Sequence, residues 1–213
     1  MASIASFNSL VDTWLGSLGE SSILPRYTSV LSLLNKKNSG VPSLIAVDKD
    51  KTGNALDIAK SYAKALGSGR VCIFKSTFKE ETETDIFGEQ AILTGGLPFL
   101  INSAYNTLIK NGYDSTVAWF VCYYEIKTIV DLFHDNGFDQ FYKMISDTAR
   151  IGGISSGKKL IDESFRSKLD LLLQDIKDGS FYQSLKNAKD EKLPVDFDEI
   201  EKQTKKILQI IKK

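Results

Sequence analysis

The stretch TDIFGEQAILTGGLPFLINSAYNTLIKN, residues 84–111, decides how the fold is predicted. Before it, short apolar runs alternate with turns. From it onward, apolar residues recur at the three- and four-residue spacing of helices almost to the end of the chain. We therefore expect a mainly α protein. Its predicted helices cover residues 84–111, 115–135, 139–149, 158–177, 180–188 and 195–212, with breaks at Gly112, Asn136-Gly137, Gly152-Gly153, Gly179 and Pro194.

Upstream of this helical region the pattern predicts one βαβ unit. Residues 43–47 and 71–74 are short apolar runs typical of buried strands, and residues 54–66 between them have helical periodicity. A parallel pair of strands leaves both edges open, so more sheet, a helical cover or another subunit must complete it. Residues 1–40, rich in Ser, Leu and Asn, are expected to be a leader of unknown role with short helices.

Composition and charge exclude several classes of function. Lys plus Arg and Asp plus Glu number 27 each, so the net charge is zero and no overall field attracts a polyanion such as nucleic acid; we expect no nucleic-acid partner. The two cysteines lack metal-ligand spacing, which favours a reducing cytoplasm. The apolar start has no basic residue before Arg26, and polar residues interrupt the longest uncharged stretch, 90–109. We therefore expect a cytoplasmic protein without a membrane span.

A carboxylate in apolar surroundings is the first candidate for chemistry. The predicted helix 115–135 is apolar nearly all round before its first carboxylate, Glu125, and such a helix packs in an interior or an interface. An ionised carboxylate there requires a cation or strong hydrogen-bond donors. A pair with Lys127 or another basic residue, or a helix face that reaches water, would explain Glu125 equally well.

Asp85 and Glu89 are the second candidate. Four residues apart, they lie on one face of a predicted helix and repel each other unless something positive sits between them. Two close carboxylates suit Mg²⁺, and Glu125 would supply a third. The alternative is that Asp85 and Glu89 lie in a first helical turn and complement the helix dipole.

Several motifs closely resemble, in order, those of the ketol-acid reductoisomerase family, also called acetohydroxy acid isomeroreductases. KEETETDIFGEQA, residues 79–91, resembles the family's metal-binding segment. EIKTIVDL, residues 125–132, and ISDTA, residues 145–149, resemble two later motifs. VPSLIAV, residues 41–47, and residues 53–64 also fit, so the resemblance extends from about residue 41 to the C-terminus.

The resemblance implies an NADPH- and Mg²⁺-dependent oxidoreductase. Such an enzyme isomerises a 2-acetolactate-type acetohydroxy acid by alkyl migration and reduces the product, a step of valine and isoleucine biosynthesis. By position, Asp85 would bridge two Mg²⁺ ions, Glu89 would bind one and Glu125 the other, while Ser146 would hold the substrate. The resemblance also implies a knotted helical domain over 84–213, preceded by a βαβ remnant of the nucleotide-binding domain over 41–83. Sites shared between subunits imply a homodimer.

Two departures from the family pattern modify this expectation. One turn before Glu125, where the family has a further metal-binding glutamate, this chain has Val121, which cannot ligate a hard cation. The family's Gly-rich nucleotide-binding turn precedes the βαβ unit, and residues 1–40 do not resemble it. We therefore expect a shortened member with a partial Mg²⁺ site. The NADPH-binding residues, unknown in this chain, would come from a full-length relative in a mixed dimer. The alternative is a non-catalytic dimerisation or regulatory module.

Overall fold

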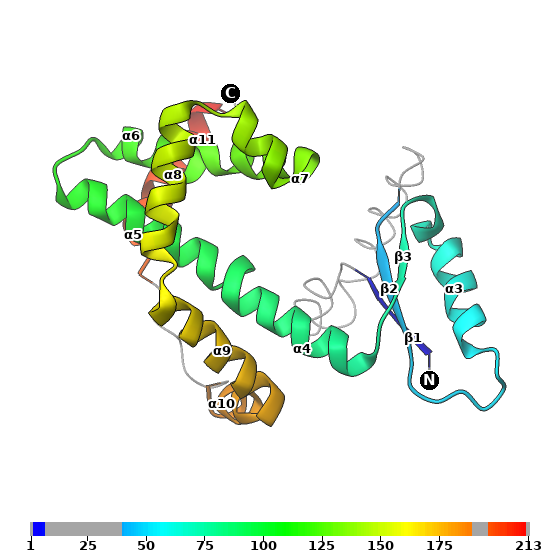
Figure 1. Cartoon of the computed structure of the whole chain (residues 1–213). Helices are drawn as coiled ribbons and strands as arrows, with labels where there is room; N and C mark the ends of the chain where they lie inside the picture. Colours follow the sequence, from blue (N-terminus) through cyan, green and yellow to red (C-terminus); the bar gives the residue numbers. More distant parts are fainter. Residues whose placement is uncertain (1, 7–39, 189–195, 212–213) are drawn as a thin grey trace. The chain divides into compact units, whose positions relative to one another are not determined.

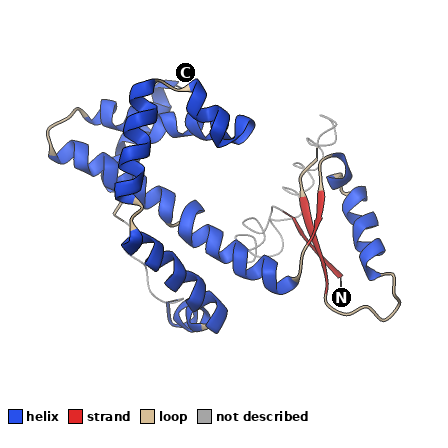
Figure 2. Ribbon diagram, viewed as in Figure 1, coloured by secondary structure: helices blue, strands red, loops and turns tan. Residues whose placement is uncertain are grey.

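The computed structural model describes residues 2–6, 40–188 and 196–211, which belong to two compact units, Met1–Ile86 and Phe87–Lys213 (Figure 1). Strands occur only in the first unit among the described residues, and the second unit is helical (Figure 2). The chain is therefore mainly α, as predicted. No helix of the described ranges is long and apolar enough to cross a membrane.

The first unit is built on a three-stranded sheet of order β1-β2-β3. The central strand β2 (Ser43–Val47) pairs in parallel with β3 (Ile73–Lys75), and α3 (Ala55–Ala65) connects them through the 3₁₀ turn η2 (Ser68–Arg70). Small residues of α3 let the helix approach the sheet, so that Ala59 and Ala63 are buried against Ile45. The predicted βαβ unit is confirmed.

The start of the chain differs from the prediction. β1 (Ala2–Ser6) pairs antiparallel with the whole of β2, whereas short helices were expected there. The open edge of β2 explains the difference: its unpaired backbone groups need partners, and a five-residue strand is too short to stand out as a pattern. More sheet was one of the three predicted ways to complete the βαβ unit. The rest of the predicted leader, residues 7–39, lies outside the described residues.

The predicted helix 84–111 is three successive segments. α4 (Phe78–Gly88) begins earlier than expected, continues into the π-helical turn η3 (Glu89–Leu93) and is followed by α5 (Gly96–Lys110). The predicted helix 115–135 is divided in the same way, into α6 (Ser115–Trp119), the π-helical turn η4 (Phe120–Tyr124) and the start of α7 (Glu125–Met144). Periodicity detected these helices but not the widened turns inside them.

The later breaks were partly misplaced. Gly137 interrupts α7 with φ 73°, as predicted, but Gly152 and Gly153 lie inside α8 (Asp147–Leu160). A helix tolerates such glycines at about 1 kcal/mol each. The break comes after α8 instead, where the Asp162 side chain accepts a hydrogen bond from the backbone of Phe165 and caps the next helix. The remaining helices are α9 (Glu163–Asp178), α10 (Ser180–Ala188) and α11 (Asp198–Ile211); residues 195 and 212 of the last predicted helix are not described.

The second unit has a small core formed by α5, α6 and α11. Its buried side chains are Tyr105, Ala118, Trp119, Ile200 and Ile207. Many large apolar side chains of this unit remain exposed in the single chain. The knotted course implied by the family resemblance, and the domain limits at residues 40 and 83, stay predictions.

Candidate metal site

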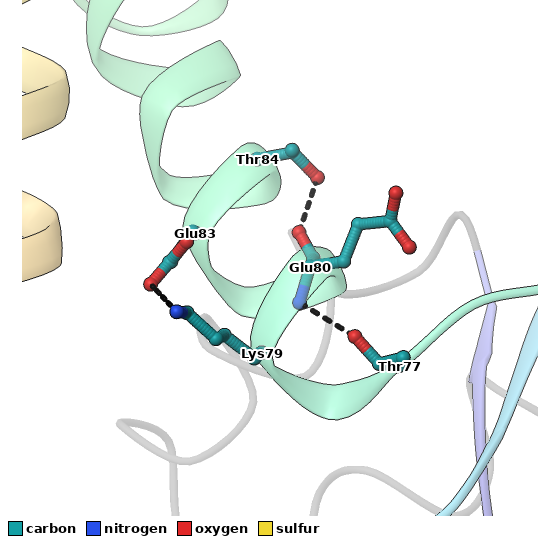
Figure 3. Close-up of polar contacts among 5 residues, drawn as sticks. All are labelled: Thr77, Lys79, Glu80, Glu83 and Thr84. Atoms are coloured by element: carbon teal, nitrogen blue, oxygen red, sulfur yellow. Dashed lines mark hydrogen bonds and ion pairs between the residues drawn. The ribbon is translucent and has the colours of Figure 1, made fainter.

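A capping motif fixes where α4 begins (Figure 3). The Thr77 hydroxyl oxygen accepts a hydrogen bond from the backbone N–H of Glu80 at 3.1 Å, and the Thr84 hydroxyl donates to the Glu80 carbonyl at 2.7 Å. An ion pair between the exposed Lys79 and the partly buried Glu83 (4.0 Å) adds a contact on the next turn. The Thr-x-x-Glu spacing is a helix-start signal that sequence reasoning missed.

The early start of α4 changes the position of the two predicted metal ligands. Glu80 and Glu81 occupy the first turn, whereas Asp85 lies in the last part of α4 and Glu89 begins η3. The alternative that Asp85 and Glu89 complement the helix dipole from a first turn is therefore wrong. Both side chains are partly buried.

The acidic face of α4 affects the protonation of one of its carboxyl groups. Partial burial is the main cause that raises the pKa of Glu81, and the negative charge of Asp85 is the second. A hydrogen bond from Thr82 lowers this pKa. The charge of Asp85 thus acts on Glu81, whereas the repulsion between Asp85 and Glu89 inferred from their spacing stays a prediction. A cation bound beside them would relieve it.

The turn η3 holds the backbone of Glu89 in place. Its carbonyl oxygen accepts hydrogen bonds from the N–H groups of Thr94 (2.8 Å) and Gly95 (3.1 Å) and from the Thr94 hydroxyl (3.0 Å). A Cβ on Gly95 would lie 2.1 Å from the Gln90 carbonyl oxygen, and one on Gly96 would lie 2.0 Å from that of Ala91. Only glycine fits at these two positions, so the Gly-Gly pair was the available sequence signal for this turn.

Glu125 follows directly after the second π-helical turn. Its backbone N–H bonds to the carbonyl of Phe120, the five-residue spacing that defines η4. Glu125 is exposed, and Lys127 forms its ion pair with Asp131 instead, so the predicted alternative of a Glu125–Lys127 pair is wrong. Val121 lies within η4 and is 45% exposed.

The apolar helix around Glu125 is not buried within the single chain. Val117, Phe120 and Tyr124 are 59%, 46% and 47% exposed. The expectation of a packed interior is therefore not met in one chain. An interface, the other predicted setting for such a helix, accounts for this surface, and so does the alternative of a helix face that reaches water.

Ser146 is the N-cap residue of α8. Its hydroxyl oxygen accepts the backbone N–H of Ala149 at 3.2 Å, and the side chain is exposed. Beside it, between the end of α7 and the start of α8, lies an open cavity of about 440 Å³ whose lining includes Tyr142, Lys143 and Arg150. The predicted substrate residue is thus fixed by a helix cap, and its neighbours Ile145 and Asp147 line the cavity.

The described part of one chain does not assemble the predicted site. No three His, Cys, Asp or Glu residues within it form a group able to hold a metal ion. Asp85 and Glu89 follow each other by one helical turn, but they and Glu125 form no such three-carboxylate cluster. Their assignment as Mg²⁺ ligands, and that of Ser146 to the substrate, stay predictions.

Comparison with known proteins identifies the family. The family model described as "Ketol-acid reductoisomerase, C-terminal domain" matches residues 78–212, more than half of the chain. The chain belongs to the ketol-acid reductoisomerase family. A second family model, "Acetohydroxy acid isomeroreductase, NADPH-binding domain", matches residues 29–72. The reductoisomerase resemblance of the sequence motifs is thereby confirmed, and the match begins upstream of residue 41.

Individual reductoisomerases agree with this assignment. A ketol-acid reductoisomerase (NADP(+)) of Campylobacter hominis is 49% identical over 145 residues, which cover 68% of this chain and 43% of the relative. A solved structure of an NADH-preferring ketol-acid reductoisomerase from an uncultured archean superposes with a TM-score of 0.74 at 30% identity, covering 80% of this chain and 54% of that one. The chain thus spans about half the length of the reductoisomerases it matches.

Proposed function

We propose that this chain supplies the Mg²⁺- and substrate-binding part of a ketol-acid reductoisomerase acting on 2-acetolactate-type acetohydroxy acids, in valine and isoleucine biosynthesis. The observation that carries the proposal is the acidic face of α4, which continues through Asp85 to Glu89 at η3 inside the segment matched by the family's C-terminal model. Family membership supports the reaction.

The donor set has the right chemistry for the metal. Asp85, Glu89 and Glu125 offer carboxylate oxygens, the ligands Mg²⁺ prefers. Mg²⁺ held by these residues would polarise the carbonyl and hydroxyl oxygens of the acetohydroxy acid. The Ser146 hydroxyl, fixed by its helix cap, would donate a hydrogen bond to the substrate.

The site is completed by a second copy of the chain. Asp85 and Glu89 come from one subunit, and Glu125 and Ser146 from the other. Two observations support this homodimer: the described residues of one chain gather no three metal-binding side chains, and Glu125 sits in exposed apolar surroundings. Covering that surface would desolvate the Glu125 carboxylate, which then requires a cation.

NADPH is the proposed hydride donor. The match to the NADPH-binding domain model covers residues 29–72, which include β2 and α3. A mixed dimer with a full-length relative would bring a second source of nucleotide-binding residues. We also propose a cytoplasmic location, supported by Cys72 and Cys122, which are both free thiols.

A second candidate function is a non-catalytic dimerisation or regulatory module of the same family. Val121 favours it, because an apolar side chain stands where the family pattern has a metal-binding glutamate. The two functions differ in turnover and in their response to Mg²⁺.

Consumption of NADPH with 2-acetolactate tests the choice. The purified chain is assayed with and without Mg²⁺, alone and after co-expression with a full-length reductoisomerase carrying an inactive metal site. Turnover that depends on both substrate and Mg²⁺, in either arrangement, supports the enzyme. If neither arrangement turns over and millimolar Mg²⁺ leaves the melting temperature unchanged, the non-catalytic module is the better description.

A further inference from the structure

The C-terminal helix α11 is hydrogen-bonded to the residue that precedes η4. Trp119 is 1% exposed, and its indole Nε1 donates to the Thr204 hydroxyl oxygen at 2.8 Å. The Thr204 hydroxyl in turn donates to the Ile200 carbonyl at 2.7 Å. The hydroxyl proton is therefore used within α11, which leaves the oxygen free to accept the indole proton. One turn of α11 thus provides the acceptor for a buried donor.

Trp119 in turn contacts the widened turn that leads to Glu125. Its ring lies 5.5 Å from that of Tyr123 and 5.6 Å from that of Tyr124, measured between centroids, and both tyrosines belong to η4. Since the Glu125 N–H bonds to Phe120 rather than to Val121, one extra residue is accommodated here. One residue corresponds to a rotation of about 100° around the helix axis.

The direction of the Glu125 carboxylate therefore depends on what keeps η4 wide. We propose that Trp119 and Thr204 are positioning residues for Glu125, and that α11 acts through their hydrogen bond to aim this carboxylate at the metal. Neither residue touches the metal itself. The inference rests on the proposed function, because it concerns Glu125 as a Mg²⁺ ligand. Without the Thr204 hydroxyl the buried indole N–H has lost its acceptor, and Trp119 and η4 must shift to find another.

The inference can be tested without an activity assay by measuring how tightly the full chain binds Mn²⁺. The electron paramagnetic resonance signal of the free ion reports the unbound fraction. Thr204→Val keeps the shape of the side chain and removes the acceptor, whereas Thr204→Ser keeps the hydroxyl. We expect the Mn²⁺ dissociation constant to rise roughly tenfold for Thr204→Val, the lower end of the effect of removing a group that orients a metal ligand, and to stay near the parental value for Thr204→Ser. Trp119→Phe keeps an aromatic ring, removes the donor and should weaken binding in the same way.

A matched control separates positioning from general stability. Thr107 on α5 also donates its hydroxyl to a carbonyl four residues back, at 2.8 Å, but it is exposed and accepts no indole proton. Thr107→Val should bind Mn²⁺ like the parent. Parental binding by both Thr204→Val and Trp119→Phe, even with lower melting temperatures, would overturn the inference and leave the proposed function standing. Absence of Mn²⁺ binding in the parent and in Thr204→Ser alike would overturn the metal function, and this inference with it.

Discussion

Glu81, Asp85 and Glu89 follow one another at intervals of four residues, which lines up three carboxylates along α4 and into η3. Burial and the charge of Asp85 raise the pKa of Glu81 above its ordinary value of 4.5. A raised pKa in the folded state means that folding favours the protonated form. The contribution of Glu81 to the free energy of unfolding is therefore fully present at low pH and is lost as the pH rises from about 4.5 through the folded-state pKa.

Glu81→Gln should consequently stabilise the metal-free protein at pH 7. The expected gain is a few tenths of a kcal/mol, the size of a partly screened like-charge pair on a helix. Denaturant unfolding at pH 7 and pH 4 measures it, and the gain should shrink at the lower pH. Glu83→Gln is the control, since it removes the ion-pair partner of Lys79 and should bring no gain. Equal gains at both pH values would contradict the proposed repulsion.

Asp85 should be indispensable for any response to magnesium. Asp85→Ala is expected to abolish the rise in melting temperature that millimolar Mg²⁺ gives the parent, because a ligand stabilises a protein only through the site it occupies. Thermal scans with Mg²⁺ and with matched NaCl measure this rise. A variant that responds like the parent would show that the metal site lies elsewhere.

Val121 offers the opposite test, a gain of binding. Val121→Glu should tighten Mg²⁺ binding several-fold, since it adds a carboxylate one turn before Glu125, where the family pattern has one. Val121→Gln has nearly the same shape without the charge and should bind like the parent. Isothermal titration compares the three proteins. Unchanged affinity in Val121→Glu would argue against the site geometry carried over from the family.

At the scale of elements, sequence periodicity predicted the helices and strands that are defined by their buried faces. It missed the features that depend on individual hydrogen bonds. β2, α3 and α10 matched closely because a short apolar run or helical spacing decides them. The π-helical turns were missed because they keep helical spacing on both sides and differ by one residue of width. Asp85, Glu89 and Glu125 could be chosen as candidate metal ligands from their spacing and surroundings, an assignment that stays a prediction. The hydrogen bond between Trp119 and Thr204 could not be predicted, because 85 residues separate the partners.

The glycine pair that follows η3, Gly95 and Gly96, gives a prediction at the scale of elements. Gly96→Ala would force its Cβ to within 2.0 Å of the Ala91 carbonyl oxygen, so we expect a destabilisation of about 1–3 kcal/mol, as for other overpacked sites. Gly153→Ala is the matched control: a Cβ there meets nothing within 4 Å, and the substitution should stabilise α8 by about 0.5–1 kcal/mol. In urea denaturation, the midpoint concentration should therefore fall for Gly96→Ala and rise for Gly153→Ala. Equal tolerance of alanine at both positions would contradict the described turn.

At the scale of the whole molecule, a site shared between subunits predicts complementation. Asp85→Asn and Glu125→Gln chains should each fail to bind Mn²⁺ as homodimers. When the two variants are co-expressed, they form a heterodimer of the two variant chains. One of its two sites then combines the native Asp85 of one chain with the native Glu125 of the other, so binding should return at about one ion-binding site per heterodimer. Purification through two different affinity tags isolates that species. If this heterodimer binds no more Mn²⁺ than the two variant homodimers, all the ligands of each site lie in one chain.

The glycine pair at the end of η3 also has a consequence for how the protein tolerates change. In a library that varies every position, Gly95 and Gly96 should each accept a single amino acid whatever the oligomeric state, because their own backbone leaves no space. Ile92 and Leu93, just before them, are 59% and 51% exposed in one chain and should accept many residues if that surface meets water. If a second subunit covers it, the two positions will accept apolar residues only. The amino acids accepted at these four positions would then report both the tight turn after η3 and the contact between subunits.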